Sequence, residues 1–157
     1  MRVLLLLGCA ACAGTGGGRL AARLQRPHNP EQRFDVAVGA KQCAGGHGVL
    51  LEAASEAGNG LLLWLRGDST TPGEYALRTA SDTSAGRAAT AALRFMTGDI
   101  AHGLTLDSGV VRLSAGRPRL AGDIVAAGTD LGGAQHVSFT AHFADVAVAD
   151  STMCAPA

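Results

Sequence analysis

Apolar and polar residues alternate along most of the chain from Phe34 onward, which is the period of a β-strand with one buried face. The first run places Phe34, Val36 and Val38 on one side. Further alternating or continuous apolar runs lie at 49–51, 61–65, 74–79, 93–96, 111–114 and 119–124. In the longest run, Val137, Phe139, Ala141 and Phe143 alternate with His136, Ser138, Thr140 and His142. The pattern therefore predicts a chain built mainly of strands.

Three details of the pattern predict local geometry. Asn59-Gly60 lies between two apolar runs and indicates a hairpin, because both residue types tolerate positive φ. After Phe143 the apolar positions change parity, which predicts either a β-bulge near Ala144-Asp145 or the end of the strand. Helical spacing occurs around residues 85–93, where we expect a strand from Thr90 in preference to a short helix.

Eight or nine short strands joined by Gly, Asp, Ser and Pro turns are typical of an antiparallel β-sandwich or barrel. We therefore predict an all-β domain over residues 33–157. The length of 157 residues fits one such domain. Aromatic residues make up 4% of the chain, and large side chains dominate core energetics, so we expect a modestly stable core and a second stabiliser.

The first residues have the pattern of an export signal. Met1-Arg2 is a minimal positive region, residues 3–7 are aliphatic, and Leu6-Leu7-Gly8-Cys9 resembles a bacterial lipobox. The resemblance implies a signal peptide over residues 1–8 and lipid on the Cys9 sulfur, with the protein anchored at the cell envelope. The apolar region of a signal peptide normally has about 7–15 residues, so the short run also fits a start codon further upstream.

Two other interpretations of the leader stay open. Ala11-Cys12-Ala13 fits an ordinary secretory cleavage site, which gives a soluble secreted or periplasmic protein. A buried N-terminal strand is the structural alternative. A transmembrane helix needs about 20 apolar residues, which the run lacks.

Residues 9–32 are predicted to be a tether between the anchor and the domain. Residues 13–18 are rich in glycine and flexible. Residues 19–26 have the spacing of two helical turns, with Leu20 and Leu24 on one face. Near a bilayer each arginine of this segment favours anionic headgroups by about 1 kcal/mol. A solvated linker fits the same residues.

Charge is distributed unevenly along a chain whose formal net charge is zero. Residues 1–30 contain four arginines and no acid, whereas residues 31–157 contain nine basic and thirteen acidic residues. Nucleic-acid-binding domains usually have a basic excess, so we predict no nucleic-acid partner. A basic leader before a mildly acidic body favours export.

Cysteine positions suggest the second stabiliser. With Cys9 and Cys12 in the leader, Cys43 and Cys154 remain, and one pair in an exported chain indicates a disulfide. In the chain-entropy model, closing a loop of about 110 residues contributes roughly 4–5 kcal/mol. A Cys/His metal site is the alternative, but the body lacks the usual ligand spacing.

The search for chemistry gives a contact face and no catalytic motif. The sequence contains no G-x-S-x-G, H-E-x-x-H, phosphate-loop or EF-hand string. His136 and His142 share a strand face but lie about 20 Å apart at roughly 3.3 Å per residue, so one metal ion cannot bind both. We predict no metal or cofactor. The face formed by His136, Ser138, Thr140 and His142 is a candidate contact surface, with a solvated sheet face as the alternative.

The body resembles a family of small bacterial lipoproteins whose all-β domain has no assigned function. The resemblance rests on the F-x-V-x-V-G pattern at residues 34–39, G-x-Y-x-L at residues 73–77, and a patterned hairpin and strand at residues 108–143. It implies an all-β fold and a lipid anchor, and it carries over no active site.

A second resemblance is to membrane-bound inhibitors of c-type lysozyme, which are lipid-anchored β-barrels. Residues 84–87 and 95–101 are similar to two paired segments of that family, although the tyrosine, tryptophan and lysine of the family pattern are missing.

The sequence therefore predicts a non-enzymatic, lipid-anchored binding or structural module of the envelope. Its partner is an envelope protein or a small ligand. The alternatives are an inhibitor of a cell-wall hydrolase and a secreted hydrolase.

Intact-mass measurement of the mature protein, expressed with its leader, tests the leader and the disulfide together. We expect diacylglycerol on Cys9 and a mass that changes on reduction and alkylation of Cys43 and Cys154. A mature chain that starts at Gly14, or an unprocessed Met1, contradicts lipidation. Free thiols in the unreduced protein contradict the disulfide.

Overall fold

Nine strands account for the alternating pattern. The structure is a computed structural model that describes residues 17–43, 48–67, 71–84, 86–130 and 135–150. Within these residues the chain forms strands joined by turns, without a helix. The strands are β1 (Gly18–Gln25), β2 (Gln32–Gln42), β3 (Val49–Ala54), β4 (Gly60–Arg66), β5 (Gly73–Leu77), β6 (Ala88–Thr97), β7 (Ile100–Ala115), β8 (Arg119–Asp130) and β9 (His136–Asp150).

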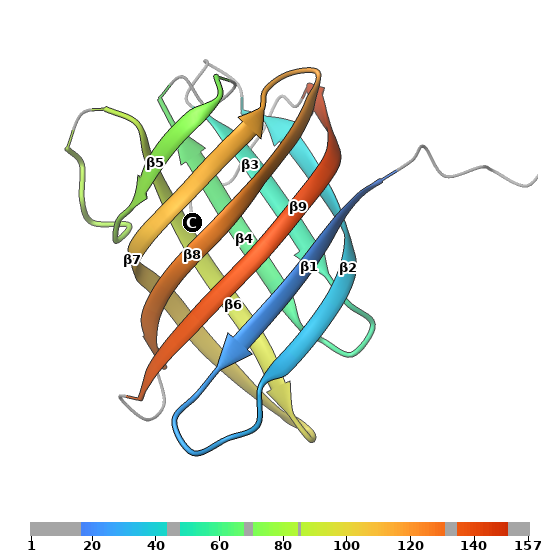
Figure 1. The fold of residues 1–157 in the computed structure, drawn as a ribbon, viewed down its shortest axis with the longest axis vertical. Helices are drawn as coiled ribbons and strands as arrows, with labels where there is room; N and C mark the ends of the chain where they lie inside the picture. Colours follow the sequence, from blue (N-terminus) through green and yellow to red (C-terminus); the bar gives the residue numbers. More distant parts are fainter. Residues whose placement is uncertain (1–16, 44–47, 68–70, 85, 131–134, 151–157) are drawn as a thin grey trace, which may run out of the picture.

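The strands form one closed barrel in the order β1-β2-β3-β4-β6-β5-β7-β8-β9. β1 completes the closure, because it pairs antiparallel with β2 on one side and with β9 on the other. Figure 1 shows this seam, with β1 in blue beside β9 in red. The all-β prediction is confirmed, and of the two architectures left open the structure is the barrel.

The first strand corrects the prediction for residues 19–26, which we placed in a tether with helical spacing. Leu20, Ala22 and Leu24 face the core and are 0%, 3% and 1% exposed, while the residues between them face solvent. A spacing of four between Leu20 and Leu24 fits a helix and a strand equally well. Burial of Ala22 as well has the two-residue period of a strand. The folded domain thus begins at β1 and not at residue 33.

Two short strands are each inserted between longer ones. β1 lies between β2 and β9 and pairs with both. Past the N-terminal end of β1, the C-terminal ends of β2 and β9 pair directly with each other in parallel, with Gln42 opposite Asp150. Gly18 lies where these strands converge, and a Cβ there would approach the Val146 Cα to 2.7 Å. β5 is inserted in the same way: β6 pairs with β7 along one part and with β5 near Ala88.

Apolar side chains fill the barrel interior. Tyr75, Phe95, Phe139 and Phe143 are its largest fully buried side chains, and leucine, valine and alanine occupy most other inward positions. Small residues make room for the rings: a Cβ on Gly122 would lie 2.9 Å from Cζ of Phe143. The scarce aromatic residues are therefore concentrated where burial contributes most.

The local predictions have mixed outcomes. The hairpin between β3 and β4 is confirmed, but its turn is not Asn59-Gly60. Gly58 carries the positive φ of 86°, and Gly60 already pairs with Ala54. The Asn59 side chain instead accepts a hydrogen bond from the Met96 amide at 3.0 Å.

Two further local predictions hold. The bulge is confirmed, because β9 contains one extra residue between the positions opposite Leu120 and Gly122, and Asp145 has a φ of 58°. Residues 88–97 form a strand, as expected, although it begins two residues before Thr90.

Two adjacent leucines on β4 lie on opposite faces of the barrel wall, so substituting each one tests which face is buried. Leu63 is 0% exposed and Leu62 is 45% exposed. We expect Leu63→Ala to lower the free energy of unfolding by about 2–5 kcal/mol, because it leaves a cavity in the barrel core. Leu62→Ala should change it by about 0.5 kcal/mol or less. Denaturant unfolding measures both, and equal effects contradict the assignment of faces.

Candidate functional site

A hollow lies on the outside of the barrel, over the seam where the chain closes. It is a groove of about 600 Å³ across β1, β2, β8 and β9, which we call the seam groove. Its lining comes from three consecutive residues on each strand: residues 21–23, 33–35, 123–125 and 140–142. The closing strand and its neighbours thus build the groove jointly.

A small residue forms the floor of the seam groove. Ala21 faces outward on β1, between His142 of β9 and Asp35 of β2. On the far side of His142, β8 contributes Asp123 in the same row. Because successive strands lie about 4.8 Å apart, the short Ala21 side chain leaves a depression between longer neighbours.

The next outward row contains two arginines that face each other. Arg23 of β1 is directly opposite Arg33 of β2, and on its other side it is opposite Thr140 of β9. Val125 of β8, which is 50% exposed, ends the row opposite Thr140. Like charges directly opposite on neighbouring strands are destabilising unless an anion lies between them.

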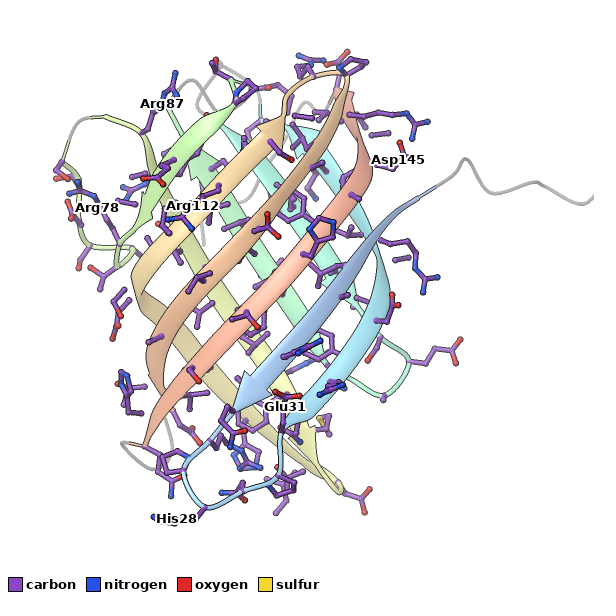
Figure 2. The ribbon with its side chains drawn as sticks, viewed as in Figure 1. His28, Glu31, Arg78, Arg87, Arg112 and Asp145 are labelled. Carbon is purple, nitrogen blue, oxygen red and sulfur yellow. The ribbon has the colours of Figure 1, made fainter. Side chains whose placement is uncertain are left out.

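The charged groups of the seam groove are unequally paired. Arg19 contacts Asp35 at 2.7 Å, the His142 Nδ1 is 2.9 Å from Asp123 Oδ1, and Arg33 pairs with Glu31. Within the described residues Arg23 has no ion pair or hydrogen bond of its side chain. Figure 2 shows Glu31 near the β1–β2 turn, at the lower end of the barrel. Arg23 is therefore the arginine of the groove that lacks an acidic partner among the described residues.

Only part of the predicted contact face lines the seam groove. His136, Ser138, Thr140 and His142 all face outward on β9 and are exposed, as the alternation indicates. Thr140 and His142 line the seam groove, whereas His136 and Ser138 lie outside its lining. Sequence analysis missed Arg23, Arg33 and Asp123. They alternate with core residues, but the sequence does not reveal which strands are neighbours.

A second outer hollow of about 340 Å³ lies over β3, β4 and β6. It is lined by Ala53, Ala54, Gly60, Leu61, Leu62, Ala92, Leu93 and Arg94. Its floor is apolar and it contains a single charged side chain, Arg94, so it has little to orient a polar ligand.

A polar cluster lies at the end of the barrel where β6 turns into β7. The Phe95 and His102 rings stack with centroids 4.8 Å apart, and the Arg26 guanidinium lies 4.9 Å from the Phe95 centroid. The His102 Nδ1 is 3.6 Å from an oxygen of Asp130, which is 8% exposed. Within the described residues neither this imidazole nor that of His142 has a serine or cysteine hydrogen-bonded to it. The arrangement can orient an imidazole, and it presents no nucleophile.

Two predicted positions, Cys9 and Cys154, lie outside the described residues. Cys43 follows β2 and is 4% exposed. The lipid anchor and the Cys43–Cys154 bond therefore stay predictions.

The two segments similar to lysozyme inhibitors are not brought together. Residues 95–101 form the β6–β7 hairpin, in which Thr97 pairs with Ile100. Residues 84–87 precede β6 at its opposite end. Seven residues of β6, residues 88–94, or roughly 23 Å of strand, separate them.

Two features are absent from the described part of the chain. No group of three or more His, Cys, Asp or Glu side chains is placed to hold a metal ion there. The same residues include no helix long and apolar enough to cross a membrane.

Comparison with known proteins adds no relative. A scan against protein-family models found no matching model, and searches of curated proteins and of solved structures found no significant match.

Proposed function

We propose that this chain is a non-enzymatic envelope lipoprotein, anchored through Cys9, whose barrel binds a ligand in the seam groove. The interior is filled with apolar side chains, so a ligand meets the barrel on its outside. The observation that carries the proposal is the Arg23–Arg33 pair, in which Arg23 lacks an acidic partner among the described residues.

The side chains of the groove favour a ligand with an anionic group. Arginine supplies up to five donors in a planar fork and binds carboxylates and phosphates in two-point contacts. Arg23 and Arg33 are directly opposite each other on adjacent strands, and Thr140 adds a hydroxyl on the other side of Arg23. Ala21 and Val125 provide apolar surface beside them. The proposed ligand is therefore a short acidic peptide, whose carboxylates contact the arginines and whose apolar parts contact Ala21 and Val125.

A disulfide between Cys43 and Cys154 is part of the same proposal. The parallel pairing of β2 with β9 places Gln42 opposite Asp150, and Cys43 directly follows Gln42. Cys154 follows Asp150 by four residues, and four residues span up to about 13 Å. The register thus allows the two cysteines to meet at the end of the seam.

Binding of an acidic peptide tests the seam groove. We expect a short peptide with two glutamates to shift the amide resonances of Ala21, Arg23 and Thr140, and its glutamine counterpart to leave them unchanged. Arg23→Gln should weaken binding about tenfold, because it removes a charge-assisted contact of about 1.4 kcal/mol. Arg117→Gln is the matched control, since Arg117 pairs with Asp150 and does not line the groove. Equal binding of both peptides, or an unaffected Arg23→Gln variant, contradicts the site.

Inhibition of a cell-wall hydrolase is the second candidate function, because the β6–β7 hairpin has an exposed tip. Ile100 is 64% exposed and follows Asp99 at the tip of this hairpin.

A lysozyme assay separates the two functions. If the seam groove is the binding site, adding the protein at micromolar concentration leaves the activity of lysozyme unchanged. Inhibition that is lost in Ile100→Ser and kept in Arg23→Gln assigns the function to the hairpin instead.

A further inference from the structure

A second arginine pair lies on the opposite side of the barrel from β1, where the chain crosses from β5 to β6. Arg66 ends β4 and pairs with Ala88 of β6, and Arg78 directly follows β5. Figure 2 shows Arg78 on the crossover, beside the barrel wall. Although Ala88 is on the barrel wall, it is only 2% exposed. The crossover therefore lies over this part of the wall.

Both arginines hold Asp82, which lies in the crossover. The Arg66 Nη1 donates to the Asp82 carbonyl oxygen, and the Arg78 Nη1 donates to the Asp82 Oδ2 at 3.0 Å. The Ser84 amide donates to the other carboxylate oxygen at 2.8 Å. Hydrogen bonds from the Ser84 side chain and amide, together with the Arg78 contact, hold the pKa of Asp82 well below its usual range. The carboxylate is thus charged at neutral pH.

The cluster has more positive than negative charge and more donors than acceptors. Within the described residues one carboxylate, that of Asp82, belongs to the cluster, and Arg78 contacts it, whereas Arg66 contacts the Asp82 backbone. Two guanidinium groups and one carboxylate leave one positive charge over. Arg66 Nε, Arg66 Nη2 and Arg78 Nε are buried and have no hydrogen-bond partner. Buried polar atoms are nearly always hydrogen-bonded, so three such donors in one cluster indicate a missing acceptor.

The geometry of Arg66 selects the kind of acceptor. Its Nη1 is used by Asp82, whereas Nε and Nη2 form the opposite edge of the guanidinium plane. Two parallel N–H groups on one edge match two oxygens of a single phosphate, sulfate or carboxylate. We propose that this edge of Arg66, with Arg78 Nε, binds a small tetrahedral oxyanion such as phosphate or sulfate beneath the crossover.

Bound oxyanion would also fix the crossover to the barrel wall. Arg78 is joined to Asp82 and Ser84, so an anion that bridges the two arginines adds a second connection between the crossover and β4, beside the Arg66–Asp82 hydrogen bond. The site is separate from the seam groove in residues and in position. It therefore stands or fails independently of the proposed function.

Titration with inorganic phosphate and with sulfate, at ionic strength held constant with chloride, tests the site in the whole chain. We expect saturable shifts of the Arg66 and 78–84 amide resonances. Arg66→Gln should weaken binding at least about tenfold. Arg66→Lys should weaken it nearly as much, because lysine keeps the charge and loses the two-point edge. Arg117→Gln is the control, since Arg117 pairs with Asp150 elsewhere.

The following results would overturn the proposed oxyanion site. Shifts that follow chloride alone, or Arg66→Lys binding as tightly as the unmodified chain, overturn the site. Asp68 lies outside the described residues and is the nearest acid along the sequence to Arg66. If phosphate binds only after Asp68→Asn, that carboxylate is the missing acceptor and the proposal is wrong. Circular dichroism of each variant separates lost binding from lost folding.

Discussion

Closure of the sheet through β1 is the constraint on which the rest of the structure depends. An open sheet of nine strands would leave two edges of unpaired N–H and C=O groups and one apolar face exposed to water. β1 removes both edges, because residues 18–24 pair with β2 and residues 19–25 pair with β9. Its inward side chains, Leu20, Ala22 and Leu24, complete the core at the seam.

Closure also decides where function can lie. Because the interior is filled by buried apolar side chains, the polar chemistry of the described residues is on the outer wall and at the barrel ends. On the wall, the strand spacing of about 4.8 Å brings together side chains that are distant in sequence. Arg23 and Thr140 are neighbours for this reason. Small outward residues such as Ala21 then determine where a hollow forms.

The sequence predicts most of the strands, but it predicts few of the residues in the candidate sites. Alternation identifies most of the strands, since a half-buried strand must repeat every two residues. It failed at β1, where Leu20 and Leu24 fit a helical period and glycine-rich sequence precedes them. The turn of the β3–β4 hairpin was misplaced because Asn59 hydrogen-bonds to Met96, a contact made by the tertiary structure.

Strand pairing explains why the candidate sites were mostly missed. Thr140 and His142 were identified from their own strand, but Arg23, Arg33 and Asp123 join them only through the order β2-β1-β9-β8. The Arg66–Asp82 contact similarly requires the β5–β6 crossover. A single sequence gives the face on which each side chain lies, and it does not give the partner strand.

The most direct test of barrel closure is a nuclear Overhauser measurement across the seam. The account predicts cross-strand contacts between backbone protons of β1 and β9, in the register that places Ala22 opposite Ala141, together with slow exchange of β1 amides. Amides of residues 18–25 that exchange as fast as an unstructured peptide, without contacts to β9, would contradict it.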